Sequence, residues 1–260
     1  MQAIAIFDID GVIRDVSRSY RLAIMDTVEQ FTNSVYRPTM ADIDQLKAEG
    51  IWNNDWHVSQ ELTLRHIKAQ GGDRQQVELD YEQLVDYFQG RYRGTAFDGY
   101  IAQETLLIDP EYLADLTAQG ISWGFFSGAT RGSAEFVLCD RLQLTQPVLI
   151  AMEDAPEKPN CQGLLQAVIA LETRPNFPPG LPVIYAGDTA ADMQTIQNAR
   201  QQFPSRRWLG VGILPPHVQQ SPDKGDAYSQ NLLDKGADIV LSGLRALTPI
   251  QITALLERDV

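Results

Sequence analysis

Short apolar runs recur along the chain, and glycine, proline or aspartate bounds each of them. Apolar runs of this length, without polar alternation, are typical of β-strands buried on both faces, as in a parallel sheet. We therefore expect strands at Ala3–Phe7, Ile121–Phe126, Val148–Met152, Pro182–Ala186, Trp208–Leu214 and Asp238–Leu241.

Amphipathic helical patterns fill the intervals between these runs. Asp109 stands at an N-cap position, Pro110 follows at the first helical position, and Gly120 closes the segment. Two further helices are predicted from Cys161 to Leu171 and from Thr189 to Ile196. Because strands alternate with helices, the sequence predicts an α/β fold with a doubly wound parallel-sheet core.

One long interval breaks this alternation, because it holds helical patterns and no clear strand. Apolar residues of Tyr20–Phe31 fall on one helical face, and so do those of Val77–Phe88 behind a capping box of Asp73 and Gln76. This pattern predicts an all-helical domain inserted after the first strand. The predicted boundaries are residues 1–14 and 105–260 for the core and 15–104 for the insertion.

Composition narrows the chemistry. The 260 residues include 34 acidic and 21 basic side chains, which gives a formal charge of −13 at pH 7. Such a surface repels nucleic-acid phosphates and anionic lipid headgroups, so we expect neither as a main partner.

We see no targeting segment and no apolar stretch of membrane-spanning length, and therefore expect a soluble, cytoplasmic protein. Two cysteines are too few for a disulfide framework, and three histidines are too few for a histidine-rich metal cage. We therefore expect carboxylates to carry the chemistry of the site.

Two acids leave the first predicted strand in the string Asp8-x-Asp10-Gly11. Residues two apart in an extended segment point the same way, so both carboxylates can address one substrate. Gly11 allows the chain to turn away sharply behind them. In open parallel sheets the ligand binds beyond the carboxyl ends of the strands, which is where these acids are predicted to lie.

Three later strand ends carry further polar groups. Asp188 and Asp192 follow the strand at Pro182–Ala186, and together with the first acids they would form an oxygen-rich pocket that suits Mg²⁺ better than zinc. Ser127 and Gly128 offer a hydroxyl and a small-residue backbone amide to an anion. Lys158 supplies the counter-charge that a phosphate group needs.

These motifs, in this order, resemble the four motifs of the haloacid dehalogenase superfamily. The resemblance rests on Asp8-x-Asp10-Gly, on Ser127, on Lys158-Pro159, and on Gly187-Asp188-x-x-x-Asp192. The helical insertion resembles the C1-type cap of the phosphoglycolate phosphatase and β-phosphoglucomutase branch. The resemblance implies a Rossmann-like core, a mobile cap and an aspartyl-phosphate mechanism.

The resemblance also implies a role for each acid. Asp8 would be the nucleophile that attacks phosphorus. Mg²⁺ would be held by Asp8, by Asp188 and by the backbone carbonyl of Asp10. Asp10 would protonate the leaving oxygen and then activate water, while Asp192 would support the metal site without touching the ion.

The remaining implied positions concern the substrate. Ser127, Gly128 and Lys158 would hold the phosphate oxygens. Arg14 departs from the apolar residue usual in this branch; it could reach a second substrate anion or simply face solvent. Tyr20 stands where β-phosphoglucomutases carry a cap histidine, and it could contact substrate or pack within the cap.

The sequence thus predicts a Mg²⁺-dependent phosphatase acting on a small phosphorylated metabolite, as a monomer or a homodimer. A phosphomutase is the nearest alternative, because it uses the same phosphoaspartate. A dehalogenase is disfavoured, because those relatives need neither the metal nor an acid at position 10. A non-catalytic module that binds a phosphorylated ligand is the alternative from another class.

Overall fold

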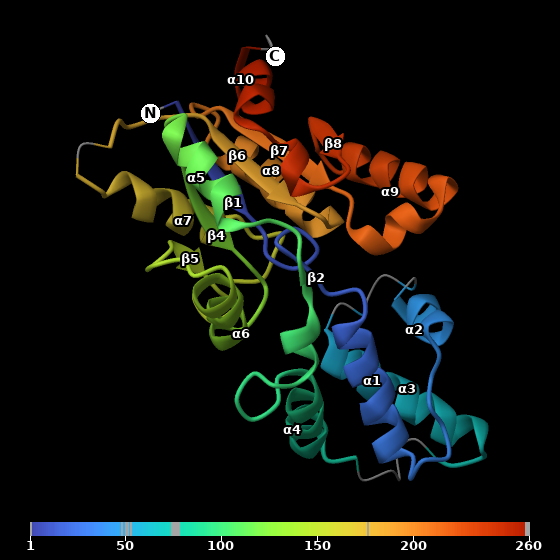
Figure 1. The fold of residues 1–260 in the computed structure, drawn as a ribbon. Helices are drawn as coiled ribbons and strands as arrows, with labels where there is room; N and C mark the ends of the chain where they lie inside the picture. The colour runs from blue at the N-terminus through green and yellow to red at the C-terminus, as the bar shows by residue number, and fades with distance from the viewer. Residues whose placement is uncertain are drawn as a thin grey trace. The chain divides into compact units, whose positions relative to one another are not determined.

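The structure is a computed structural model that describes residues 2–47, 49, 52, 54–73, 79–175 and 177–257. Contacts divide the chain into two compact units (Figure 1). The core unit comprises Met1–Asp15 and Thr105–Val260, and the inserted unit comprises Val16–Glu104. The first division therefore follows Asp15, where the sequence analysis placed it after residue 14.

The core unit is built on a six-stranded sheet in which every neighbouring pair of strands is parallel. The strand order is β5-β4-β1-β6-β7-β8, so the chain builds one side of β1 first and then returns to build the other. This reversal beside the first strand confirms the predicted doubly wound fold. The strands are β1 (Ala3–Phe7), β4 (Ile121–Phe126), β5 (Leu149–Ile150), β6 (Val183–Gly187), β7 (Trp208–Ile213) and β8 (Ile239–Leu241).

The edge strand β5 is shorter than the predicted run Val148–Met152. Only Leu149 and Ile150 pair with β4. The amide of Met152 instead donates to the carbonyl of Ala129 at 3.0 Å, in the loop that follows β4. After Ile150 the chain therefore no longer pairs with β4 and instead hydrogen-bonds to the loop that follows β4.

Helices cover both faces of the sheet. Successive residues of β1 point to opposite sides, so Ala3, Ala5 and Phe7 join one buried cluster and Ile4 and Ile6 join another. The first cluster packs against α5 (Pro110–Ala118), α6 (Arg131–Glu135), a π-helical turn (Phe136–Arg141) and α10 (Pro249–Glu257). The second packs against α7 (Gln162–Glu172) and α8 (Ala190–Gln202), while α9 (Pro222–Asp234) contacts β7 and β8.

In its described residues, the inserted unit is helical. Its α-helices are α1 (Ser19–Phe31), α2 (Met40–Lys47), α3 (Asp55–Ala69) and α4 (Tyr81–Tyr92), and a 3₁₀ turn follows at Tyr100–Gln103. The helix predicted behind Asp73 begins later than expected, because the side chain of Asp80 accepts from the amide of Gln83 and caps α4. The predicted capping partner Gln76 lies outside the described residues.

A two-stranded antiparallel ribbon, which the sequence analysis did not predict, lies in the core unit where the chain leaves for the insertion and returns. In it, β2 (Arg14–Asp15) pairs with β3 (Thr105–Leu106). The amide of Leu107 also donates to the carbonyl of Ile13 at 2.8 Å. The two crossing points of the chain are thereby held together inside the core unit.

Asp26 is the charged hub of the inserted unit. The residue is 7% exposed, and its carboxylate lies 2.6 Å from Arg91 Nε, 2.6 Å from the Tyr100 hydroxyl and 2.7 Å from the Arg37 guanidinium. Burial alone would raise the pKa of Asp26, but hydrogen bonds from Tyr100, Arg37 and Arg91 outweigh it and leave the pKa below its ordinary value. Three separate segments are thus tied to α1.

We expect Asp26→Asn to lower the free energy of unfolding by about 1–2 kcal/mol at pH 7. Because the folded-state pKa is lowered, the ionised carboxylate stabilises the unit above the unfolded pKa, and that contribution is lost as pH falls through the folded pKa. Urea unfolding from pH 7 to pH 3 should therefore show the two proteins converging in acid. Asp44→Asn removes an exposed partner of Arg21 as the control; a gap for Asp26→Asn that widened in acid would contradict the assignment.

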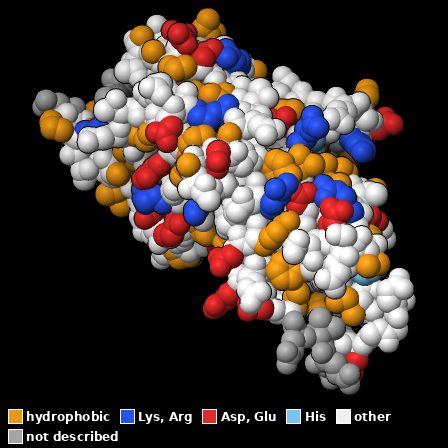
Figure 2. All heavy atoms as spheres, turned by 60° about the horizontal axis from the view of Figure 1, so that its bottom comes forward, with side chains coloured by type: hydrophobic (Ala, Val, Ile, Leu, Met, Phe, Trp, Pro, Cys, Tyr) orange, Lys and Arg blue, Asp and Glu red, His pale blue; other side chains and the backbone are white. Residues whose placement is uncertain are grey.

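Among the described residues, no helix combines the length and apolar character needed to cross a bilayer. Acidic and basic side chains intermix on the face shown in Figure 2, although the formal charge of the chain is −13. On that face, charge alone marks no single docking surface.

Candidate active site

Three adjacent strands each deliver a polar residue to the same edge of the sheet. Asp8 follows β1, Ser127 follows β4 and Asp188 follows β6, and β1 lies between the other two strands (Figure 1). Backbone hydrogen bonds extend the ladder to this edge: the amide of Asp8 donates to Ala186 at 2.9 Å and the amide of Ser127 donates to Ile150 at 2.9 Å. The backbones of Asp8 and Ser127 are therefore held by the hydrogen bonds of the sheet.

Three carboxylates converge at this edge. Oxygens of Asp8, Asp188 and Asp192 lie within 4.8 Å of one another. Gly11 makes the approach of Asp188 possible: a Cβ at position 11 would lie 2.1 Å from Asp188 Oδ2, and the φ of +74° is itself one that glycine adopts without strain. The glycine of the first motif thus shapes the acidic cluster.

Two of the three clustered carboxylates, those of Asp8 and Asp188, have raised pKa values. Burial, opposed by the ammonium of Lys158 and assisted by repulsion from Asp192 and Asp10, raises the pKa of Asp8 to about 7. Burial and repulsion from Asp8 raise the pKa of Asp188 well above its ordinary value. A cation at this point would relieve both effects, and an all-oxygen donor set fits Mg²⁺.

Lys158 lies between two of the acids. Its Nζ is 2.8 Å from Asp8 Oδ1 and 2.7 Å from Asp192 Oδ1, and its side chain is 11% exposed. Burial alone would lower the pKa of Lys158, but Asp192 and Asp8 outweigh burial and raise it, so the ammonium keeps its charge at neutral pH. The rings of Phe126 and Tyr185, centred 5.1 Å and 5.6 Å from Nζ, add cation–π contacts.

Asp192 is fully buried and surrounded by donors. Oδ1 accepts from the Tyr185 hydroxyl at 2.6 Å and faces Lys158, while Oδ2 accepts from the amide of Thr189 at 3.0 Å and from its hydroxyl at 2.6 Å. Thr189 and Asp192 also form the capping box that begins α8. With both oxygens committed in this way, Asp192 is better suited to orienting Lys158 than to binding an ion.

Tyr185 is a site residue that was not predicted from the sequence. Its hydroxyl donates to Asp192 and its ring flanks Lys158, so it touches two predicted site residues. One signal was available: Tyr185 and Gly187 are two apart in a strand and share a face. A Cβ at Gly187 would lie 2.4 Å from Asp192, so this face of β6 is the one that meets the acid.

Ser127 and Gly128 lie at the mouth of β4. Ser127 is 1% exposed, and its Oγ accepts from the amide of Ala129 at 3.1 Å, which leaves the hydroxyl proton available for donation to an anion. Gly128 is exposed, and no atom lies within 4 Å of the position that a Cβ would take. A ligand oxygen can therefore approach this backbone closely.

Asp10 lies beside Arg14. The Arg14 Nε donates to Asp10 Oδ1 at 2.6 Å, and the Arg14 side chain is fully buried while that of Asp10 is 27% exposed. The expectation that Arg14 could face solvent is therefore wrong, because its side chain is fully buried. Burial of a guanidinium requires a partner that compensates its charge, and Asp10 is such a partner. The assignment of Arg14 to substrate binding stays a prediction.

Tyr20 belongs to the inserted unit, on α1. Its ring stacks on that of Tyr92 in α4, with centroids 4.4 Å apart and an interplanar angle of 20°. This contact favours the packing role that the sequence analysis weighed for Tyr20. Its substrate-binding assignment stays a prediction.

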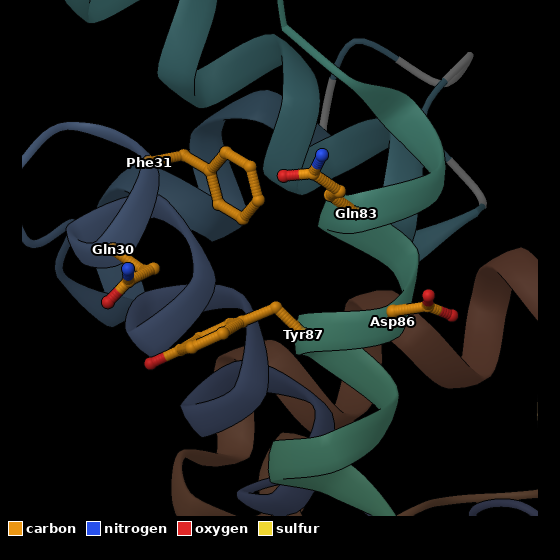
Figure 3. A pocket seen from close by; sticks show the side chains of 5 residues that line it. All are labelled: Gln30, Phe31, Gln83, Asp86 and Tyr87. Carbon is orange, nitrogen blue, oxygen red and sulfur yellow. The ribbon is translucent and has the colours of Figure 1, made fainter.

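A pocket of about 390 Å³ lies within the inserted unit, between α1 and α4 (Figure 3). The rings of Phe31 and Tyr87 meet edge to face beside it, with centroids 6.2 Å apart. Its lining comprises Gln30, Phe31, Gln83, Asp86 and Tyr87, so none of the predicted site residues borders it.

A family model described as a haloacid dehalogenase-like hydrolase matches residues 3–200. The chain belongs to this family. The resemblance drawn from the motifs is thereby confirmed, and so is the expectation of an enzyme of the hydrolase class. The match includes all the predicted site residues, in both units.

One curated relative, from Phytophthora nicotianae, carries the name imidazoleglycerol-phosphate dehydratase. It is 30% identical over 249 residues, which is 91% of this chain. The chain spans about half of that relative, 49% of its length.

Solved structures share the fold of this haloacid dehalogenase-like hydrolase. They include a HAD hydrolase of family IA, variant 3, from Entamoeba histolytica (TM-score 0.66, 13% identity, 99% of this chain and 100% of that one). Phosphatase Tt82 from Thermococcus thioreducens has a TM-score of 0.64 at 21% identity, over 81% and 92% of the two chains. A β-phosphoglucomutase from Clostridium difficile has a TM-score of 0.58 at 15% identity, over 98% and 96%.

Proposed function

We propose that this enzyme is a Mg²⁺-dependent phosphatase that hydrolyses a small organophosphate monoester through a phosphoaspartate at Asp8, with residues 16–104 as its cap. The observation that carries the proposal is the buried carboxylate of Asp8, 2.8 Å from the ammonium of Lys158 and clustered with Asp188. A carboxylate can attack a phosphate dianion only where positive charge is held nearby. Membership of the hydrolase family supports the same reaction class.

The reaction would proceed in two displacements. In the first, an oxygen of Asp8 bonds to phosphorus while the bond from phosphorus to the alcohol oxygen breaks; that oxygen keeps the electron pair and takes a proton from Asp10. In the second, Asp10 takes a proton from water as the water oxygen bonds to phosphorus. The bond between phosphorus and Asp8 then breaks, which restores the carboxylate and releases inorganic phosphate.

Three groups would hold the phosphate oxygens that are not transferred. The hydroxyl of Ser127 and the backbone of Gly128 lie at the mouth of β4, and Lys158 contacts Asp8 itself. Positioning and charge stabilisation are the main requirements of phosphoryl transfer. Asp192 would act through Lys158, which it contacts at 2.7 Å.

The acidic cluster fits a divalent cation, because its oxygens converge and the pKa values of Asp8 and Asp188 are raised. Asp8, Asp188 and the backbone carbonyl of Asp10 would hold Mg²⁺. When bound, the ion supplies positive charge to the phosphate oxygens and to the attacking carboxylate.

A phosphate-release screen tests the proposal. The panel comprises sugar, polyol, glycolate, nucleotide and amino-alcohol phosphates, together with imidazoleglycerol phosphate, which the name of the Phytophthora relative suggests. We expect release from at least one ester, loss of release after treatment with a chelator, and recovery when Mg²⁺ is returned.

Two other outcomes would contradict the proposal. Interconversion of sugar phosphates without net phosphate release would favour a phosphomutase. Binding of Mg²⁺ and of phosphate esters without turnover of any ester would favour a non-catalytic module.

A further inference from the structure

The turn between Asp10 and Arg14 is closed by its own backbone. The amides of Ile13 and Arg14 both donate to the carbonyl of Ile9, at 2.7 Å and 3.1 Å, and the amide of Gly11 donates to the carbonyl of Arg14 at 2.9 Å. These bonds bring residue 14 back beside residue 10, where a β-bridge joins them. The proximity of the two side chains follows from this turn.

Arg14 is fixed from a second direction as well. It begins β2, where it pairs with Leu106 in β3. Its backbone is thus held by the turn on one side and by the ribbon on the other. A side chain with so constrained a backbone can impose its position on a neighbour.

The guanidinium of Arg14 contacts the carboxylate of Asp10. Arg14 ranks among the largest fully buried side chains of the described residues, and its Nε–H donates to Asp10 Oδ1 at 2.6 Å. Arginine stays protonated throughout the working pH range, so it is a permanent donor and cannot itself relay a proton. Its contact can therefore orient the Asp10 carboxylate, while the transferable proton belongs to Asp10 alone.

We infer that Arg14 is a positioning residue that holds the Asp10 carboxylate in place for proton transfer to and from the substrate oxygen and water. The inference rests on the proposed function, since it assumes the roles assigned to Asp8 and Asp10. It is an alternative to a direct contact between Arg14 and substrate, which stays a separate prediction. The two assignments differ in what they do to kinetics: a lost substrate contact raises KM, whereas a misplaced acid lowers the rate of the step that needs its proton.

The choice of leaving group isolates that step. An alkyl phosphate releases a basic alkoxide that requires a proton, whereas 4-nitrophenyl phosphate releases a phenolate that departs without one. The ratio kcat/KM reports events up to release of the alcohol. Loss of Asp10 positioning should therefore depress kcat/KM for the alkyl ester selectively, while partial unfolding would depress both esters by the same factor.

The experiment compares Arg14→Met with the parent, using 4-nitrophenyl phosphate and the alkyl phosphate turned over fastest in the screen. We expect kcat/KM to fall about 10- to 100-fold for the alkyl ester and less than about 3-fold for the aryl ester, with KM nearly unchanged. Arg14→Lys retains a cation beside Asp10 and should fall between parent and Arg14→Met. Arg206→Met, which removes a partner of Glu172 elsewhere in the core unit, is the matched control.

The outcomes are distinguishable. Equal losses on both esters in folded Arg14 variants, or a loss confined to KM, would overturn the inference and leave the phosphatase proposal intact. If the parent released phosphate from neither ester, the proposed function would fail and the inference with it.

Discussion

Replacing Asp8 by asparagine should lower phosphate release by about 10⁴-fold or more, because the amide lacks the anionic oxygen that attacks phosphorus. The substitution preserves size and shape at a position that is 5% exposed. The measurement is kcat for the best ester of the screen, with Mg²⁺ present. Asp115→Asn changes an exposed acid on α5 and should leave kcat within about twofold of the parent, as surface substitutions usually do.

A folding measurement separates lost chemistry from lost structure. Burial raises the pKa of Asp8 to about 7, so without metal the folded state holds the Asp8 proton more tightly than the unfolded state does. The ionised Asp8 carboxylate therefore lowers the free energy of unfolding, and this loss grows as pH rises from the ordinary aspartate pKa through 7. Asp8→Asn should therefore melt at or above the parent in chelator at pH 8, by a margin that shrinks toward pH 4. Added Mg²⁺ should raise the melting temperature of the parent more than that of the variant.

The result that would contradict the role of Asp8 is a folded asparagine variant that turns over within about tenfold of the parent, since losing a nucleophile costs far more than that. In that case the phosphoryl group would pass directly to water. The acidic cluster would then serve only to hold a cation.

The sequence predicted the core because its information there is local. Apolar runs bounded by turn residues define buried strands, and the polar residue directly after each strand must lie at the carboxyl edge of a parallel sheet. Asp8, Ser127 and Asp188 satisfy that condition, and the structure brings them to one edge. The capping role of Asp109 was equally local, since its side chain accepts from the amide of Tyr112 three residues on.

Partners from distant elements could not be predicted in this way. Arg14 was expected to face solvent or substrate, but its burial depends on the turn that returns it to Asp10 and on pairing with β3, which is distant in sequence. Tyr185 looked like one more apolar strand residue, because nothing near it in sequence shows that its hydroxyl meets Asp192. The pairing of β2 with β3 joins the two segments that connect the core unit to the insertion. These segments are far apart in sequence, so the local pattern of apolar and polar residues cannot predict their pairing.

Replacing Lys158 by methionine should affect stability and activity together. The substitution keeps an unbranched side chain between Phe126 and Tyr185 but removes the ammonium shared by Asp8 and Asp192. Removing one partner from a buried ion pair leaves uncompensated charge, so we expect a loss of about 3–5 kcal/mol in the free energy of unfolding. Turnover by the folded fraction should fall about 100-fold or more, because the phosphate loses a preorganised positive charge.

Graded variants make this result specific. Tyr185→Phe keeps the ring beside Lys158 but removes the hydroxyl that donates to Asp192, so it should cost about 1–2 kcal/mol and reduce turnover only several-fold. Lys235→Met removes an exposed lysine after α9 and should change the free energy of unfolding by less than about 0.5 kcal/mol. Urea unfolding in chelator and kcat in Mg²⁺ measure both properties. If Lys158→Met behaved like Lys235→Met, the ammonium would hold neither the carboxylates nor the phosphate, and the charge balance proposed for Asp8 would be wrong.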